Sequence, residues 1–217
     1  MTQDAAWRRD LEAGLAALGQ EQPGGAAERY ARLIEKLARW GARVNLTAIR
    51  EPQAMVAGHI LDSLAVRPWL HGRRVIDIGT GAGFPGLPLA IAEPRRQFVL
   101  LDSNGRKIRF VQHMIAELGL DNTSAVQSRA ENYAPGERFD TVIARALAAM
   151  PGLVKLAAHL MQRDGVLLAQ KGKYPAAELD ELSKLPDLWE YSVSELTIPG
   201  LEQRARHLVC LRRAPST

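Results

Sequence analysis

Short apolar runs alternate with amphipathic segments from Arg74 onward, and this alternation limits the possible folds more than any other feature. RVIDI (74–78) and FVLLD (98–102) have the length and composition of buried strands, and the stretch between them predicts a short helix over 86–92. Parallel strands need crossover connections, which are usually helices, so repeated strand–helix units predict a parallel sheet with helices on both faces. The expected fold class is therefore α/β.

The rest of the chain continues this pattern up to its last two strands. Further strands are expected over 123–128, 139–145 and 165–170, with helices over 104–118 and near 150–161 and 175–184. Two late strands are expected at about 190–198 and 206–212. Because the segment between them is too short for a crossover helix, we expect seven strands in all, of which the last two form an antiparallel hairpin.

The first 70 residues have helical periodicity and no strand pattern. The expected helices span 4–18, 26–40 and a third segment from Pro52 towards Pro68. We therefore expect an N-terminal helical cap, residues 1–70, that packs on a second domain, residues 71–217.

Composition indicates a globular protein, because 47% hydrophobic and 24% charged residues can fill a core and cover it. The sequence has no apolar run of the length of a signal peptide or a membrane span. We expect a cytoplasmic protein without a membrane partner. The lone Cys210 lies in an alternating run, which favours a buried strand cysteine over a reactive thiol.

A glycine-rich corner, VIDIGTGAGFPGLPLA (75–90), follows the first expected strand. Gly81, Gly83 and Gly86 satisfy the spacing G-x-G-x-x-G, and Asp102 lies about twenty residues further on, at the end of the second strand. Glycines allow a ligand to approach the backbone, and an acid at that position can accept both ribose hydroxyls of an adenosine-type cofactor. The corner therefore predicts a cofactor site, against the alternative that its glycines only turn the chain.

Asp77 favours one cofactor over another. A carboxylate two residues before Gly79 would repel a pyrophosphate by about 3 kcal/mol at a separation of about 5 Å and an effective dielectric of about 20. S-adenosylmethionine carries a sulfonium and an ammonium group, so the same carboxylate attracts it. Asp77, Gly79 and Asp102 together predict S-adenosylmethionine, with a nicotinamide-dependent oxidoreductase as the alternative that shares the glycine spacing.

The segment after the fourth strand limits which chemical groups can be the methyl acceptor. A cytosine-C5 methyltransferase needs a nucleophilic cysteine there, and the one cysteine of the chain is Cys210. Enzymes that methylate exocyclic amines commonly have an Asn/Asp-Pro-Pro-aromatic motif, whereas this chain has ARALAAM (144–150). A ring nitrogen such as guanine N7 has a free lone pair and needs no proton removed, so positioning can suffice. We therefore expect no catalytic side chain.

Basic residues are concentrated in the middle of the chain, where residues 95–173 hold twelve Lys and Arg against seven Asp and Glu. This surplus suits an RNA backbone, with a solvated surface or a non-catalytic RNA-binding module as alternatives. We expect the side chains that contact RNA phosphates to flank the cofactor pocket: Arg129, Lys171, Lys173 and Arg206. Arg106, Lys107 and Arg109 begin a helix just beyond Asp102, and the pattern leaves open whether they form a solvated helix face.

His59 and Asp62 lie three residues apart and hence on one face of a helix. They can join the helical segment to the sheet by a structural hydrogen bond, or they can face the substrate, and both readings stay open. No second His or Cys stands at metal-ligand spacing nearby, so no metal is expected.

Several stretches resemble the RsmG (GidB) family of bacterial guanine-N7 methyltransferases, which modify a single guanine of 16S ribosomal RNA. The matching stretches are NLTAIREP, HILDSL, VIDIGTGAGFPGLPLA, LLDSNGRKIRF, VQSRAEN, FDTVIARAL, QKGK and RHLVCL. They cover most of the chain after about residue 40, and HILDSL combined with GFPG is specific to this family.

The resemblance implies a Rossmann-like seven-stranded methyltransferase sheet and S-adenosylmethionine as methyl donor. In the family the donor is held at positions that match Gly79, Phe84, Ala130, Glu131 and Arg145. An arginine after an apolar strand also needs a ligand or a carboxylate partner on physical grounds. The implied reaction is direct displacement of the methyl group onto N7, with 16S rRNA or an assembling small ribosomal subunit as the partner. We expect the protein to be a monomer.

Overall fold

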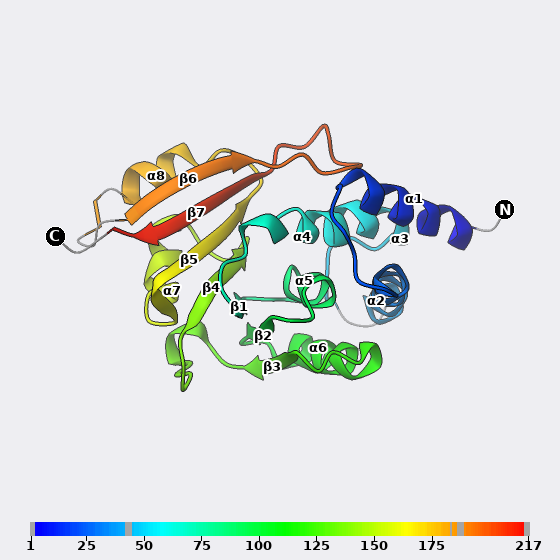
Figure 1. The fold of residues 1–217 in the computed structure, drawn as a ribbon, viewed down its shortest axis with the longest axis horizontal. Helices are drawn as coiled ribbons and strands as arrows, with labels where there is room; N and C mark the ends of the chain where they lie inside the picture. The colour runs from blue at the N-terminus through cyan, green and yellow to red at the C-terminus, as the bar shows by residue number, and fades with distance from the viewer. Residues whose placement is uncertain (1–2, 42–44, 183, 186–188, 215–217) are drawn as a thin grey trace.

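The computed structural model describes residues 3–41, 45–182, 184–185 and 189–214. Within these residues the strands form one seven-stranded sheet with the order β3-β2-β1-β4-β5-β7-β6 (Figure 1). The strands are β1 (Arg74–Ile78), β2 (Gln97–Asp102), β3 (Thr123–Gln127), β4 (Phe139–Arg145), β5 (Met161–Lys171), β6 (Trp189–Glu195) and β7 (His207–Arg213). The first five pair in parallel, and β7 pairs antiparallel with both β5 and β6. The predicted α/β class and the terminal hairpin are therefore confirmed.

Helices cover the two faces of this sheet. The helices of the second part are α5 (Gly86–Ala92), α6 (Gly105–Leu118), the short 3-10 helix η3 (Ala130–Asn132), α7 (Met150–Ala157) and α8 (Ala176–Leu182). The apolar side chains of α5 and α6 pack with Val75, on one face, and those of α7 and α8 pack with Ile76, on the other. Neighbouring residues of β1 thus point to opposite cores, as the period of a strand requires.

The N-terminal helices are α1 (Gln3–Ala17), α2 (Ala26–Gly41), α3 (Pro52–Met55), the π-helical segment η1 (Val56–Leu61), α4 (Asp62–Leu64) and the 3-10 turn η2 (Arg67–Trp69). Helices α1, α2 and α3 lie at the end of the molecule opposite α7 and α8, and α4 reaches its middle (Figure 1). Trp7, Tyr30 and Ile60 belong to the same apolar cluster as Val75 and Leu100 of the sheet, so the helical cap and the sheet share one core. The domain boundary at residue 70 stays a prediction.

The third predicted helix contains a local irregularity that the sequence pattern does not show. Residues 52–64 form a continuous helical segment in which Val56–Leu61 has π-type hydrogen bonding. A π-turn inserts an extra residue and is often found next to functional sites. The π-type segment overlaps the first half of the HILDSL stretch (59–64) and carries His59.

Strand β5 begins at Met161, four residues before its predicted start at residue 165. Met161 pairs with Phe139, whereas Val166 pairs with Thr141, so the polar residues between them form a bulge. Because these residues are polar, the apolar pattern did not predict that the strand begins at Met161.

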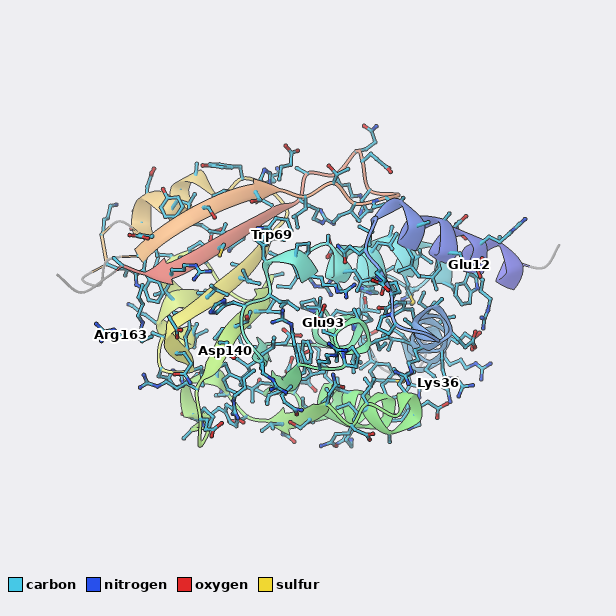
Figure 2. The ribbon with its side chains drawn as sticks, in the orientation of Figure 1. Glu12, Lys36, Trp69, Glu93, Asp140 and Arg163 are labelled. Atoms are coloured by element: carbon cyan, nitrogen blue, oxygen red, sulfur yellow. The ribbon has the colours of Figure 1, made fainter. Side chains whose placement is uncertain are left out.

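Polar contacts connect the cap to α5 and the start of β4 to the start of β1. Arg67 of the cap donates to Glu93 at the end of α5 over 2.6 Å, and Asp140 accepts from the amides of Arg73 and Arg74 at 2.6 and 2.8 Å; Glu93 and Asp140 are labelled in Figure 2. Cys210 lies half-buried in β7, and burial raises the pKa of its thiol, which fits the predicted strand cysteine. In the described part of the chain, no helix combines the length and apolar character that a membrane crossing requires.

Candidate cofactor and acceptor site

A cavity of about 560 Å³ opens at the carboxyl ends of β1, β2 and β4. β1 has β2 on one side and β4 on the other, so the chain order reverses at this point, where open α/β sheets bind ligands. Of the residues predicted to hold the cofactor, those that line this cavity are Gly79, Gly81, Phe84, Asp102, Ala130, Glu131 and Arg145. The topology therefore brings together residues that the chain separates widely.

The glycine corner needs its glycines for two different reasons. Gly79 has a φ of 70° and hydrogen-bonds through its amide to the carbonyl oxygen of Leu101 at 2.8 Å, which turns the chain over the end of β2. Gly86 begins α5, and a Cβ atom there would lie 2.1 Å from Leu100 Cδ2 and 2.9 Å from Asp77 Oδ2. The first glycine supplies a left-handed turn and the second permits close packing of helix on strand.

Asp102 presents a fixed carboxylate to the cavity. Its Oδ2 accepts from the amide of Gly81 at 2.9 Å, and its Oδ1 accepts from the amide of Asn104 at 2.8 Å. A carboxylate has about four lone-pair sites, so both oxygens can still accept hydroxyl hydrogens. This geometry suits a ribose diol.

Asp77 lies beneath the glycine corner and is not part of the cavity wall. Its side chain is fully buried, and its Oδ2 accepts from Thr80 Oγ1 at 2.6 Å and from the amide of Gly86 at 2.9 Å. No described residue bonds its Oδ1. Burial raises the pKa of Asp77 to about 7, against the opposing effect of these hydrogen bonds. Asp77 therefore holds the shape of the turn, and any action on a bound cation is exerted through its charge at a distance.

Gly83 also lies outside the cavity wall, and packing explains its presence. It has a φ of 91°, and a Cβ atom there would lie 2.3 Å from Leu87 Cδ1. The residue shapes the corner, and a direct cofactor contact stays a prediction.

His59 and Phe84, which both line the cavity, form a stacked pair. Their ring centroids lie 4.4 Å apart with an interplanar angle of 14°, and His59 Nε2 lies 2.8 Å from Thr47 Oγ1. Burial, together with the nearby positive charge of Arg145, lowers the pKa of His59 to about 3. The imidazole is therefore neutral at physiological pH.

Asp62 joins two arginines from distant parts of the chain. Its Oδ2 accepts from Arg145 Nη1 at 3.1 Å, and its Oδ1 accepts from Arg206 Nε at 3.0 Å. The predicted carboxylate partner of Arg145 is thus confirmed, and the Arg145 guanidinium also lies 5.7 Å from the centre of the Phe84 ring. Asp62 thus joins the helical segment to the end of β4. The side-chain contact of His59 with Thr47 stays within the N-terminal segment, and His59 also faces the cavity.

The four predicted RNA contacts are not brought together. Arg129 lines the cavity, is exposed and lies 3.8 Å from Glu131. The Lys171 amino group donates to the carbonyl oxygen of Ala148 at 3.0 Å and to Glu178 at 2.7 Å. Lys173 is exposed beyond the end of β5, and Arg206 is paired with Asp62. Lys171 and Arg206 are therefore committed to contacts within the protein, and their binding to RNA phosphates stays a prediction.

Several lining residues were not predicted as site residues: Thr47, Lys107, Ala146 and Leu147. Ala146 has a φ of 52°, a left-handed conformation that non-glycine residues rarely adopt and that often marks functional sites. Nothing in its residue type signals this. The basic run at the start of α6 was a usable signal for Lys107. Among the described residues, no group of three or more His, Cys, Asp or Glu could hold a metal ion.

Comparisons with known proteins agree with this geometry. The sequence profile of the GidB family, described as rRNA small subunit methyltransferase G, matches residues 26–209. The chain is 46% identical over 202 residues to the ribosomal RNA small subunit methyltransferase G of Methylococcus capsulatus, which covers 93% of this chain and 97% of that protein. It is 44% identical over 192 residues to the protein of the same name from Legionella pneumophila, which covers 88% of each.

Solved structures resemble the fold at much lower identity. A methyltransferase from Geobacter sulfurreducens gives a TM-score of 0.60 at 14% identity and covers 83% of this chain and 90% of that one. The DhpI–SAH complex gives a TM-score of 0.58 at 18% identity, with 85% and 98% covered. These likenesses establish the methyltransferase fold, while the profile and the closely related sequences establish the family. The chain belongs to the GidB family, rRNA small subunit methyltransferase G.

Proposed function

We propose that this protein transfers the methyl group of S-adenosylmethionine to N7 of a single guanine in 16S rRNA, at the position usually numbered 527. The observation that carries the proposal is one cavity lined by two unlike groups of side chains. One is a fixed carboxylate, Asp102, which is bonded to Gly81, and the other is the neutral His59–Phe84 stack beside Arg145. The names of the related proteins, ribosomal RNA small subunit methyltransferase G, support an rRNA substrate.

The residues that are present fit the cofactor. Asp102 can accept the ribose hydroxyls, and the backbone of Ala130 and Glu131 can enclose the adenine. Gly79 lines the same cavity, and Gly81 leaves the backbone open to the donor. Phe84 and Arg145 line the same cavity. When bound, S-adenosylmethionine supplies an electrophilic methyl group on a positively charged sulfur.

The protonation state of His59 supports a ring nitrogen as acceptor. A side chain whose pKa is about 3 is a poor proton acceptor at neutral pH, so His59 is not suited to be a general base. Guanine N7 needs no base, because its lone pair is already free. A neutral imidazole also adds no repulsion to the positive charge that the methylated guanine acquires. The chain's contribution is then to position the two reactants and exclude water.

The target guanine must leave its stack to reach the cavity, so it lies in an accessible loop of the RNA or of a partly assembled subunit. We propose that the protein acts on this substrate in the cytoplasm and as a monomer.

The direct test is transfer of a labelled methyl group from S-adenosylmethionine to unmethylated 16S rRNA and to small-subunit particles. Cleavage at N7-methylguanine then maps the modified position. We expect label at one guanine. Absence of label on both substrates, despite cofactor binding, would overturn the acceptor assignment. Preferential binding of a nicotinamide cofactor would favour an oxidoreductase, and RNA binding without dependence on the methyl donor would favour a non-catalytic module.

Asp102→Ala should weaken binding of S-adenosylmethionine by about tenfold to one hundredfold, because hydrogen bonds to a charged group contribute about 1.5–3 kcal/mol. Isothermal titration measures this directly. Asp121→Ala makes the same charge change at an exposed position before β3, at the opposite edge of the sheet, and should leave the affinity unchanged. Equal affinity in both variants would remove Asp102 from the cofactor site.

A further inference from the structure

A second hollow of about 630 Å³ adjoins the cofactor cavity. Leu46 and Lys107 line both, so the two spaces are neighbours with a common wall. The second hollow is formed where α2 ends and α6 begins, with Trp40 on one side and Arg106 and Arg109 on the other. We call it the α6 hollow.

The α6 hollow is strongly positive. Arg106, Lys107 and Arg109 all line it, and none of the ion pairs among the described residues includes any of the three. By contrast, Arg145 and Lys171, near the cofactor cavity, each have a carboxylate partner. Three positive charges in one hollow without a carboxylate partner attract a polyanion.

The beginning of α6 adds to this potential. Asn104 caps the helix, because its Oδ1 accepts from the amides of Arg106 and Lys107 at 3.0 and 3.4 Å. The cap occupies the side-chain oxygen of Asn104, so its amide nitrogen remains as a donor at the wall of the hollow. The positive end of the helix dipole of this 14-residue helix lies at the same place.

Trp40 supplies an aromatic wall that is held in one orientation. Its ring stacks on His113 with centroids 5.3 Å apart, and it meets Phe110 edge-on at 5.4 Å. The indole is half-buried and lines the hollow. Positive side chains next to an aromatic ring are the combination with which proteins bind single-stranded RNA, because the charges contact phosphates and the ring contacts a base or sugar.

We propose that the α6 hollow binds a nucleotide that flanks the target guanine, with its phosphate at Arg106 and Arg109 and its base or sugar against Trp40. This inference rests on the proposed function, because a guanine placed in the cofactor cavity carries its RNA strand across the shared wall at Lys107. The hollow thereby defines where the unpaired strand continues beyond the reacting base.

The test compares two double variants with the same change in net charge. Arg106→Glu with Arg109→Glu reverses two of the three charges of the hollow, and neither residue lines the cofactor cavity. Arg95→Glu with Arg138→Glu is the control, because both residues are exposed and precede β2 and β4 at the opposite edge of the sheet. Binding of a labelled 16S rRNA fragment is measured over a series of salt concentrations, together with KM for RNA, kcat and the Kd for S-adenosylmethionine.

The hollow variant should bind RNA at least about tenfold more weakly and should lower the slope of log K against log salt by about 1–2, corresponding to the lost phosphate contacts. Its KM for RNA rises, while its Kd for S-adenosylmethionine stays that of the wild type. Trp40→Leu should weaken RNA binding by about tenfold with an unchanged salt slope, and Trp40→Phe should retain most of the affinity.

An equal loss in the control variant would overturn the proposal, because the effect would then follow net charge alone. If the hollow variant binds RNA with the affinity and salt slope of the wild type, and the wild type methylates RNA, the α6 hollow does not bind the flanking nucleotide. The proposed function would then still stand. No transfer of label by the wild type to RNA or particles would overturn the proposed function, and the hollow with it.

Discussion

Asp62→Ala should lower the free energy of unfolding by about 3–5 kcal/mol, because removal of one partner from a buried ion pair leaves the other charges uncompensated. The Asp62 side chain is 5% exposed, and the two arginines that it bonds, Arg145 and Arg206, are 23% and 24% exposed. Water therefore has little access to replace the lost carboxylate. Urea unfolding at neutral pH measures the change.

Asp62→Ala should also impair methyl transfer, because Arg145 lines the cofactor cavity and would lose the contact that orients it. Asp121→Ala is the matched control, since the same truncation at an exposed position should change stability by less than about 0.5 kcal/mol. Arg206→Ala should cost less than Asp62→Ala, because Asp62 keeps Arg145 as a partner. A loss below about 1 kcal/mol for Asp62→Ala would mean that the arginines find other partners, and the cluster would then not hold the site.

Asp77→Asn should change the way in which the free energy of unfolding depends on pH, by an amount similar to the loss expected for Asp62→Ala. Burial raises the pKa of Asp77 from 3.8 to about 7, so between these values the folded state holds a proton that the unfolded chain has lost. The stability contributed by such a group is complete below its unfolded pKa and is lost as pH rises through its folded pKa. A shift of about 3 units corresponds to about 4 kcal/mol. The free energy of unfolding of the wild type minus that of Asp77→Asn should therefore fall by up to about 4 kcal/mol between about pH 4 and pH 8.

The subtraction is needed because His59 acts in the opposite direction. Its pKa falls from 6.5 to about 3 on folding, so its contribution is present above pH 6.5 and is lost as pH falls towards 3. Over much of this range the two groups offset each other in the wild type, whereas His59 cancels from the difference between the two proteins. Asp121→Asn serves as the exposed control. A difference that is constant with pH would show that Asp77 ionises as an ordinary carboxyl.

The sequence predicts those parts of the site that depend on neighbours along the chain. The strand ends at Ile78 and Asp102 follow from apolar runs, and the glycine spacing follows from the turn that it makes, so Gly79, Gly81 and Asp102 could be placed at one sheet edge. The position of Asp77 could also be predicted, but its role could not, because alternation along a strand does not tell whether a buried carboxylate faces a ligand or the first turn of a helix.

Contacts between residues that lie far apart in the chain could not be predicted from the sequence. Asp62 and Arg206 are 144 residues apart, and no local pattern signals that a carboxylate in a helix will satisfy an arginine before the last strand. Lys171 was read as a free cation although Glu178, only seven residues further on, pairs with it, because no local pattern tells how α8 packs against the end of β5. The early start of β5 was missed because a bulge tolerates polar residues that interrupt an apolar run.

The place of β7 in the sheet has a consequence for synthesis of the protein. This strand, residues 207–213, follows the other six in the chain but lies between β5 and β6, and Arg206 immediately precedes it. A nascent chain that ends before residue 206 leaves one edge of β5 without its partner and Asp62 without one of its arginines. Domains fold from the N-terminus as the ribosome extends them, so here Arg206 and β7 are made after Asp62 and after the other six strands. A chain released before residue 206 thus keeps its glycine corner but lacks Arg206, one of the two arginines that Asp62 of the cap bonds.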